Sequence, residues 1–342
     1  MLSRTASSLF WMGRYMERAE NLARLLDVSQ QLALMPGASS DVIAMPLEAI
    51  DQRALFETTG KPISSDEIAY FLMLHEDSPS SIMTSLRQAR ANAHVVRGTI
   101  TSELWESLNA TWLEMRLNTR AKIRSLGQAR FLEWVKERSH IYRGILIGTS
   151  QRNDAYLFAR LGTDLERADN TTRLFRYHLE AFAAPDQTGR SSYYAWAALL
   201  RALSAYEAYR DTYSDSLMVN RIGEMLLMRE DLPRSLLACF SNIAQTLERI
   251  NGEQSREVRR RVAQVQVQLR YGSWDNDFAQ DAVAKLDDLL IQISEVGEAI
   301  EQAYWAADVA VDAEVDAPGE TDVDVDVAAV SAASSSQTQS ST

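Results

Sequence analysis

Apolar residues recur at helical spacing along the chain as far as residue 306, and no useful length alternates with a period of two. Such spacing is typical of amphipathic helices rather than strands. It predicts an all-α, multi-helix bundle of roughly ten to twelve helices. The expected helices span residues 3–34, 64–74, a segment opening at 78, 101–124, 129–151, 153–182, 191–208, 216–228, 233–250, 255–271 and 278–306.

Pro- and Gly-containing breaks separate some of these helices. The clearest lie at residues 35–40 and 183–189, and the pattern over 41–62 is ambiguous. We expect residues 1–307 to form a single all-α domain, with pseudo-repeat halves at about 1–150 and 151–307. Residues 308–342 contain eight acidic residues and no basic one, which predicts a disordered acidic tail.

The stretch Gly13–Leu26 is rich in strong helix formers and contains no proline. On a helical wheel its apolar residues fall on one arc, and its charged residues fall on the opposite one. The same order returns 149 positions later in Gly162–Leu174, with seven identities in thirteen positions and no gap. We interpret the recurrence as an internal duplication of a Glu-Arg-Ala-(Glu/Asp)-Asn helix, and expect the two copies to pack together in the bundle centre.

The charged face of these two helices allows two interpretations. A solvated face would carry helical ion pairs such as Glu17 or Glu20 with Arg24, each worth about 0.2–0.5 kcal/mol. The repeated order instead favours a fixed geometry, either a charge network buried where two helices cross or a ligand site. The candidate residues are Arg14, Glu17, Arg18, Glu20, Asn21, Arg24, Glu166, Arg167, Asp169, Asn170 and Arg173.

Net charge changes the picture little. The chain carries −12, of which the tail supplies −8, so the body is near neutral and lacks a nucleic-acid footprint. The single Cys239 cannot form an internal disulfide and is expected in the core. No run of 18 apolar residues is present, and the apolar patch in residues 1–12 is too short for a secretory h-region, so we expect a cytoplasmic protein that does not cross a membrane.

Motifs for phosphate loops, dinucleotide binding, serine hydrolysis and zinc proteolysis are absent. A di-iron carboxylate site requires two Glu-x-x-His motifs, whereas only Glu137 and His140 have that spacing. We therefore expect no metal and no cofactor.

Two further segments mix arginine, aromatic, asparagine and glutamate residues on helices that also carry apolar faces. Core packing with Arg–carboxylate contacts is the simpler interpretation, and convergence on one polar pocket is the alternative. The secondary candidates are Arg87, Arg90, Asn92, Arg97, Glu103, Trp105, Asn109, Arg201, Glu207, Arg210 and Arg234.

The chain resembles the alpha-E family, a predicted helical domain named for its Glu-Arg motif. The matching residues are Leu2–Tyr15, Glu17–Asn21, Arg24–Leu26, Arg87–Asn92, Glu103–Asn109, Leu161–Gly162, Glu166–Asp169 and Pro233–Ser235. They cover nearly all of residues 1–306. The resemblance implies an all-α fold and assigns no catalytic residue.

The resemblance also implies which proteins this chain acts with. Family members are typically encoded beside, or fused to, circularly permuted ATP-grasp proteins and transglutaminase-like proteins, and ATP-grasp enzymes join a carboxylate to an amine through an acyl-phosphate. Three hypotheses follow. The chain is a non-catalytic accessory subunit of an ATP-grasp-dependent peptide or amide ligase system; or an enzyme of that pathway using a Glu/Arg-lined cavity; or a helical scaffold unrelated to ligation. The first is favoured, and the substrate and oligomeric state stay open.

Overall fold

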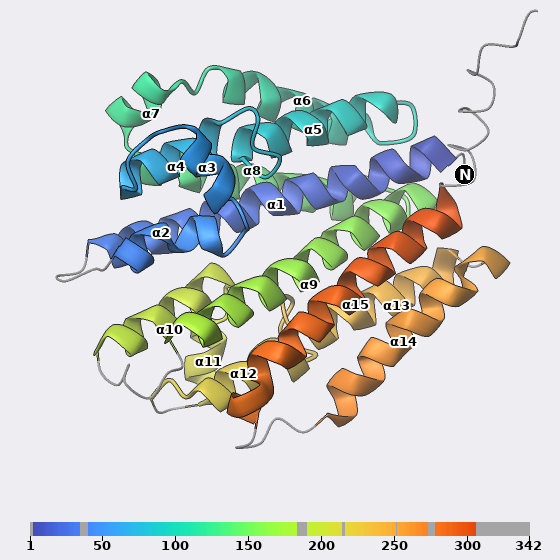
Figure 1. Ribbon diagram of the computed structural model, residues 1–342. Coiled ribbons are helices and arrows are strands. Elements are labelled where there is room, and N and C mark those ends of the chain that lie inside the picture. The colour runs from blue at the N-terminus through green and yellow to red at the C-terminus, as the bar shows by residue number, and fades with distance from the viewer. Residues whose placement is uncertain are drawn as a thin grey trace, which may run out of the picture.

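The computed structural model describes residues 3–34, 40–182, 190–213, 216–250, 252–272 and 278–305. Within these ranges every regular element is a helix, which confirms the all-α prediction (Figure 1). The acidic tail predicted over 308–342 and the linker over 183–189 lie outside the described residues.

Helices α1 (Ser3–Ala33) and α9 (Asp154–Phe182) form the centre of the molecule and run side by side in the same direction (Figure 1). They approach closely at two glycines. A Cβ added to Gly13 would lie closer than 3.0 Å to the carbonyl oxygen of Ala159, and one added to Gly162 equally close to that of Phe10. Only glycine permits such an approach of two backbones. The predicted contact between the two Glu-Arg helices is therefore confirmed.

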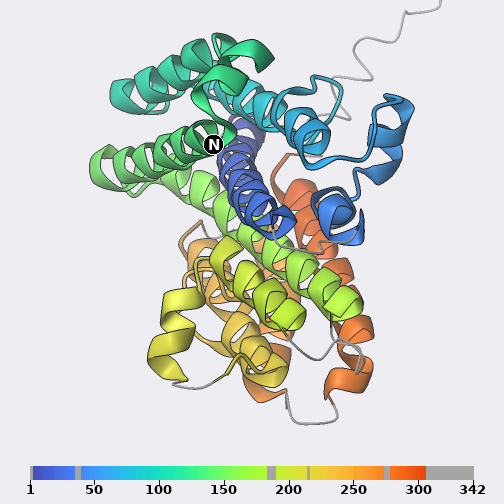
Figure 2. The same ribbon diagram turned by 90° about the vertical axis from the view of Figure 1, so that its left-hand side faces the viewer.

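The first half of the chain covers one side of the central pair (Figure 2). Helices α5 and α8 pack on α1, and α6 packs on both of them. The elements are α2 (Ser40–Glu48), α3 (Arg53–Thr58), α4 (Ser65–Leu74), α5 (Ile82–Val95), α6 (Ser102–Arg116), α7 (Arg120–Leu126) and α8 (Gln128–Thr149).

The second half covers the other side in the same order. Helices α13 and α15 pack on α9, and α14 packs on both of them. The elements are α10 (Arg190–Ala202), α11 (Tyr206–Thr212), α12 (Val219–Met228), α13 (Leu236–Ile250), the 3₁₀ turn η1 (Glu253–Ser255), α14 (Arg256–Tyr271) and α15 (Phe278–Tyr304). This order fits the internal duplication, which itself stays a prediction from the sequence.

Several helices are shorter than the periodicity predicts. The segment 101–124 divides after Arg116, because Thr119 accepts a hydrogen bond from the Lys122 N–H and starts α7 as its N-cap. The segment 191–208 divides near Ser204, whose φ of 55° ends α10. The ambiguous residues 41–62 hold the short helices α2 and α3. The described residues accordingly contain fifteen α-helices.

The core extends through both halves around the central pair. Cys239 is buried within it, as expected, and burial raises the pKa of its thiol. None of the described helices is long and apolar enough to cross a bilayer.

His178 gives the fold a specific sensitivity to acid. The ring is 1% exposed, contacts Phe182 and Trp196, and lies 2.7 Å through Nδ1 from the Leu174 carbonyl oxygen. Burial lowers its pKa to about 4. Because the folded state takes up the proton less readily than the unfolded state, stability present above pH 6.5 is lost as the pH falls toward 4.

Between pH 6.5 and pH 4, His178 is expected to lower the free energy of unfolding of the wild type by on the order of 3 kcal/mol. The variant His178→Phe should not show this decrease. The free energy of unfolding in urea, measured at pH 7, 5.5 and 4, provides the comparison. The control is His94→Gln, which changes an exposed histidine and should leave the pH dependence intact. If the free energy of unfolding fell equally with pH in the wild type and in His178→Phe, His178 would not be the source of the acid sensitivity.

Candidate functional site

Glu17 and Glu166 each follow one of the crossing glycines by one helical turn. This spacing brings the two Glu-Arg motifs against each other: Arg167 Nε lies 3.0 Å from Glu17 Oε1, and Arg18 Nε donates to Glu166 Oε1 at 2.6 Å. The two contacts are reciprocal, each joining the glutamate of one motif to the arginine of the other. They lie on opposite sides of the central pair, and the two sides differ.

On one side Glu20 is fully buried and surrounded by donors. It accepts hydrogen bonds from Arg24 Nε at 2.9 Å, Arg234 Nη2 at 2.9 Å and Ser139 Oγ at 2.8 Å, and also from Arg143 Nη1. The donors come from α1, α8 and the segment before α13. Glu20 therefore connects three parts of the chain.

Glu17 shares two of these arginines. Its carboxylate lies 2.8 Å from Arg234 Nη1 and 3.2 Å from Arg143 Nη1, in addition to Arg167. Arg234 Nη1 also donates to Asn21 Oδ1 at 2.6 Å. We call this buried network the closed cluster; its members are Glu17, Glu20, Arg24, Arg143, Arg167 and Arg234.

The closed cluster is held in its ionised state. Burial alone would raise the pKa of Glu20, but the guanidiniums of Arg234, Arg143 and Arg24 outweigh it and hold that pKa far below its usual range. The pKa of Glu17 is lowered in the same way, chiefly by Arg167 and Arg234. Since every guanidinium here faces a carboxylate at close range, the arrangement is suited to fixing the helices.

On the other side Glu166 lies between two arginines. Arg14 Nε donates to its Oε2 at 2.7 Å, and Arg18 donates to both of its oxygens. Glu166 is 5% exposed; burial raises its pKa, but Arg18 and Arg14 lower it to about 2. At neutral pH this group is therefore a carboxylate with both oxygens engaged.

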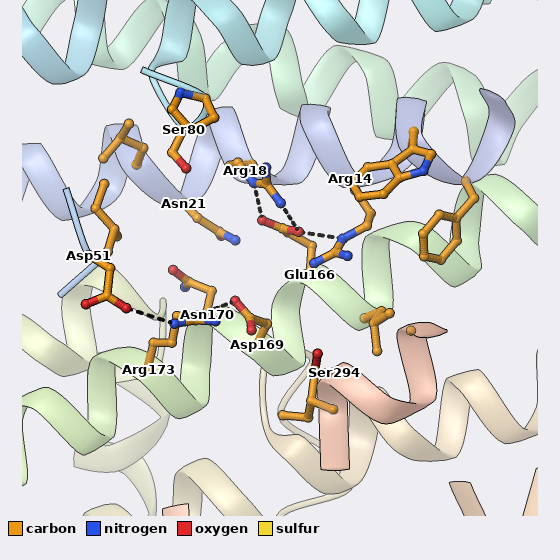
Figure 3. Close-up of a pocket in the computed structure, with 18 of the residues that line it drawn as sticks. Arg14, Arg18, Asn21, Asp51, Ser80, Glu166, Asp169, Asn170, Arg173 and Ser294 are labelled. Carbon is orange, nitrogen blue, oxygen red and sulfur yellow. Dashed lines mark hydrogen bonds and ion pairs between the residues drawn. The ribbon is translucent and has the colours of Figure 1, made fainter. Parts of the chain in front are cut away.

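An open pocket of about 530 Å³ lies beside Glu166 (Figure 3). Its walls come from α1, α9, α15 and the segments before α3 and α5. The polar lining residues are Arg14, Arg18, Asn21, Asp51, Ser80, Glu166, Asp169, Asn170, Arg173, Ser294, Glu298 and Glu301. Three arginines and five carboxylates leave the lining with a formal charge of −2.

Several polar groups face this pocket with few partners. Asp169 accepts from Arg173 Nε at 2.8 Å, and Arg173 also lies 3.6 Å from Asp51. The side-chain nitrogen of Asn21 is buried without a hydrogen-bond partner and is turned into the pocket (Figure 3). Asn170 makes no side-chain hydrogen bond to any described residue. These groups can take a ligand.

The eleven primary candidates thus divide between two sites, with Asn21 touching both. Glu17, Glu20, Arg24 and Arg167 belong to the closed cluster. The open pocket is lined by Arg14, Arg18, Asn21, Glu166, Asp169, Asn170 and Arg173. Because Glu17, Glu20 and Glu166 are at most 5% exposed, the two motifs do not form an exposed docking face.

The secondary candidates do not converge on one pocket. Arg90 donates to Asn109 and stacks over Trp105 between α5 and α6, and Arg201 stacks over Tyr206 near α11. Arg87 is joined to Glu76, and Asn92 to a backbone carbonyl of its own helix. The remaining candidates, Arg97, Glu103, Glu207 and Arg210, line neither site. Only Arg234 reaches the central motifs, as part of the closed cluster.

Two residues of α8 were not predicted from the sequence: Arg143, which belongs to the closed cluster, and Ser139, which donates a hydrogen bond to Glu20. Their only signal was a polar pair four residues apart on the inward face of a helix. His140, weighed above with Glu137 as half of a metal motif, is half exposed and lies 3.6 Å from Glu20 Oε1. Among the described residues, no group of three or more His, Cys, Asp or Glu side chains is placed to hold a metal ion.

Comparison with known proteins identifies the family to which the chain belongs. Uncharacterised proteins of Mycobacterium tuberculosis and Mycobacterium bovis are 31% identical over 117 residues, a match that covers 30% of this chain and 13% of each relative. No solved structure matches the chain. The model of the Alpha-E family, described as a predicted alpha-helical domain with a conserved ER motif, matches residues 1–305. The chain therefore belongs to the Alpha-E family.

Proposed function

We propose that this chain is a non-catalytic accessory subunit that holds a substrate for a separate ATP-grasp enzyme in a cytosolic peptide- or amide-forming system. One observation carries the proposal: the buried carboxylate of the open pocket is fixed and ionised between Arg14 and Arg18. The pocket is therefore better suited to binding than to proton transfer.

The chemistry of Glu166 supports a binding role. General acids and bases work best with a pKa near the operating pH, whereas the pKa of Glu166 is about 2. At neutral pH it has no proton to donate, and taking one up would weaken its contacts to both guanidiniums. A nucleophilic role is equally disfavoured because both oxygens accept hydrogen bonds. What the pocket offers is a fixed charge pattern beside an open volume.

The ligase setting rests on the family resemblance. Members of the Alpha-E family are typically encoded with circularly permuted ATP-grasp proteins. ATP-grasp enzymes activate a carboxylate as an acyl-phosphate and transfer the acyl group to an amine. Such an enzyme gains from a subunit that binds and orients one substrate, since orientation lowers the entropic part of the barrier. An open, charge-patterned pocket on a rigid helical frame fits that role.

Affinity purification of the tagged full chain from its native cytosol, with mass spectrometry, tests the proposal. We expect recovery of an ATP-grasp protein, and faster ATP-dependent amide formation by that protein when this chain is added. The chain alone should show no turnover across a panel of amine and carboxylate substrates. Turnover by the chain alone, lost in Glu166→Gln, would establish the enzyme alternative instead. If no ATP-grasp protein is recovered and amide formation is not stimulated, the scaffold alternative would hold instead.

A further inference from the structure

Three helices of the first half, α5, α6 and α8, can be aligned in register with three of the second half, α13, α14 and α15. In α6 the buried residues Leu104, Leu108, Thr111 and Met115 recur 154 positions later in α14 as Val258, Val262, Val265 and Leu269. In α8 the buried residues Leu132, Val135, Tyr142 and Leu146 recur with the same offset in α15 as Leu286, Leu289, Val296 and Ile300. This offset therefore identifies which residue occupies the equivalent place in the other half.

The start of α5 corresponds to the start of α13 with the same offset. Pro79 matches Pro233, and Ser81 matches Ser235. Both serines accept a hydrogen bond from the backbone N–H three residues further on: Ser81 from Thr84, and Ser235 from Ala238. The residue between each pair is Ser80 in the first half and Arg234 in the second.

The closed cluster and the open pocket are positional counterparts. With the offset of 149 for the central pair, Glu17 corresponds to Glu166, Glu20 to Asp169, Asn21 to Asn170, Arg24 to Arg173, and Arg167 to Arg18. The acid, amide and arginine of each central motif are present on both sides. The difference between a filled cluster and an open cavity must therefore come from the surrounding helices.

Two guanidiniums of the closed cluster have no counterpart in the open pocket. Arg234 corresponds to Ser80, and Arg143 corresponds to Gly297; both Ser80 and Gly297 line the cavity. Crowding does not require the glycine, because a Cβ there would meet only the Leu165 side chain at an ordinary 3.5 Å. The open pocket occupies the place where two arginine side chains lie in the closed cluster.

Without these two guanidiniums, Asp169 has fewer hydrogen-bond donors around it than Glu20 has. Glu20 accepts hydrogen bonds from Arg24, Arg143 and Arg234, whereas its counterpart Asp169 accepts side-chain hydrogen bonds, among the described residues, from Arg173 alone. Arg18 lies near enough to Asp169 to interact with its charge, but its guanidinium is hydrogen-bonded to Glu166. Glu298 and Glu301 add negative charge at the α15 wall of the pocket. A guanidinium entering the cavity would restore to Asp169 the charge-assisted hydrogen bonds that Glu20 already has.

A second group indicates what else the ligand carries. The Oδ1 of Asn21 is fixed by Arg234 at 2.6 Å, so its amide nitrogen is directed to the other side, into the open pocket. That nitrogen is a buried donor without a partner, on a side chain 5% exposed. A buried unpaired donor is costly, and a carbonyl or carboxylate oxygen of a ligand would satisfy it.

We infer that the open pocket binds a guanidinium-bearing ligand, either arginine or the arginine side chain of a peptide. Its guanidinium contacts Asp169, and an oxygen of its carbonyl or carboxylate accepts from Asn21. Arg14 and Arg18 do not exclude this cation, because Glu166 neutralises them in part. The inference rests on the proposed function for its biological role and deepens it by naming the substrate class.

Calorimetric titration of the purified full chain with L-arginine and with L-citrulline, its neutral analogue, tests the inference. We expect arginine to bind at least tenfold more tightly than citrulline. Asp169→Asn should weaken arginine binding by tenfold or more and leave citrulline unaffected. The control is Asp287→Asn, which removes the carboxylate of a half-buried ion pair outside the pocket and should bind arginine as the wild type does.

Ser80→Arg provides an independent test, since it supplies in cis the guanidinium that Arg234 gives the closed cluster. It should abolish arginine binding and raise the melting temperature of the unliganded chain. Equal binding of arginine and citrulline, binding of neither at millimolar concentration, or unchanged binding by Ser80→Arg would each overturn the inference. These titrations need no partner protein, so the two proposals can fail separately. If arginine binds but affinity purification recovers no ATP-grasp protein, only the ligase proposal fails. If an ATP-grasp protein is recovered but arginine does not bind, only the ligand assignment fails.

Discussion

Arg234→Ala is expected to lower the free energy of unfolding by about 3–5 kcal/mol, because it leaves Glu17 and Glu20 buried with too few cations. Arg234 is 6% exposed and touches both carboxylates and Asn21. Because the site is enclosed, the two carboxylates that lose this guanidinium would stay buried without a compensating partner, which costs free energy. Urea unfolding at pH 7, followed by circular dichroism, measures the change.

Ser80→Ala is the matched control for Arg234→Ala, because Ser80 occupies the equivalent place beside the open pocket. It should change the free energy of unfolding by no more than about 0.5 kcal/mol. A loss below about 1 kcal/mol for Arg234→Ala would mean that the closed cluster is solvated, in the range of surface ion pairs. That result would contradict the buried network and the comparison drawn from it.

Gly162→Ala is expected to destabilise the protein by about 3 kcal/mol or more, at the upper end of overpacking effects. Its new Cβ would lie against the carbonyl group of Phe10, which belongs to the backbone of α1 and cannot rotate away. The two central helices would have to separate, and the ion pairs between Arg18 and Glu166 would separate with them. Thermal and urea unfolding report the loss.

Gly148→Ala provides a control of opposite sign. Gly148 lies on the exposed face of α8, and nothing would lie within 4 Å of an added Cβ. Alanine is the better helix former, so the protein should gain about 0.5–1 kcal/mol. If the two variants changed stability in the same direction and by the same amount, the close approach of α1 and α9 would be wrong.

Local periodicity predicted most helices, since apolar spacing reports the buried face of each one. It failed where the break has a local cause other than glycine or proline, as at Thr119, where a side-chain cap starts a new helix. It failed again at Ser204, whose positive φ has no sequence signal that distinguishes it from a helical serine.

The repeated Glu-Arg order predicted that the central helices meet, because a charge pattern that recurs in the same order implies a shared geometry. The sequence did not reveal which arginines complete each site. Arg143 and Arg234 reach Glu20 from 123 and 214 positions away, and only the fold brings them together. The open pocket was still less visible, because it is defined by side chains that Ser80 and Gly297 lack.

The two sides of the central pair differ: one Glu-Arg site is filled by the protein's own arginines, and the other is open for a ligand. A crystal structure of the full chain grown with L-arginine tests this difference. We predict one arginine in the open pocket, with its guanidinium within hydrogen-bond distance of the Asp169 carboxylate and an oxygen at the Asn21 amide nitrogen. An empty pocket at saturating arginine, or arginine bound elsewhere, would contradict it.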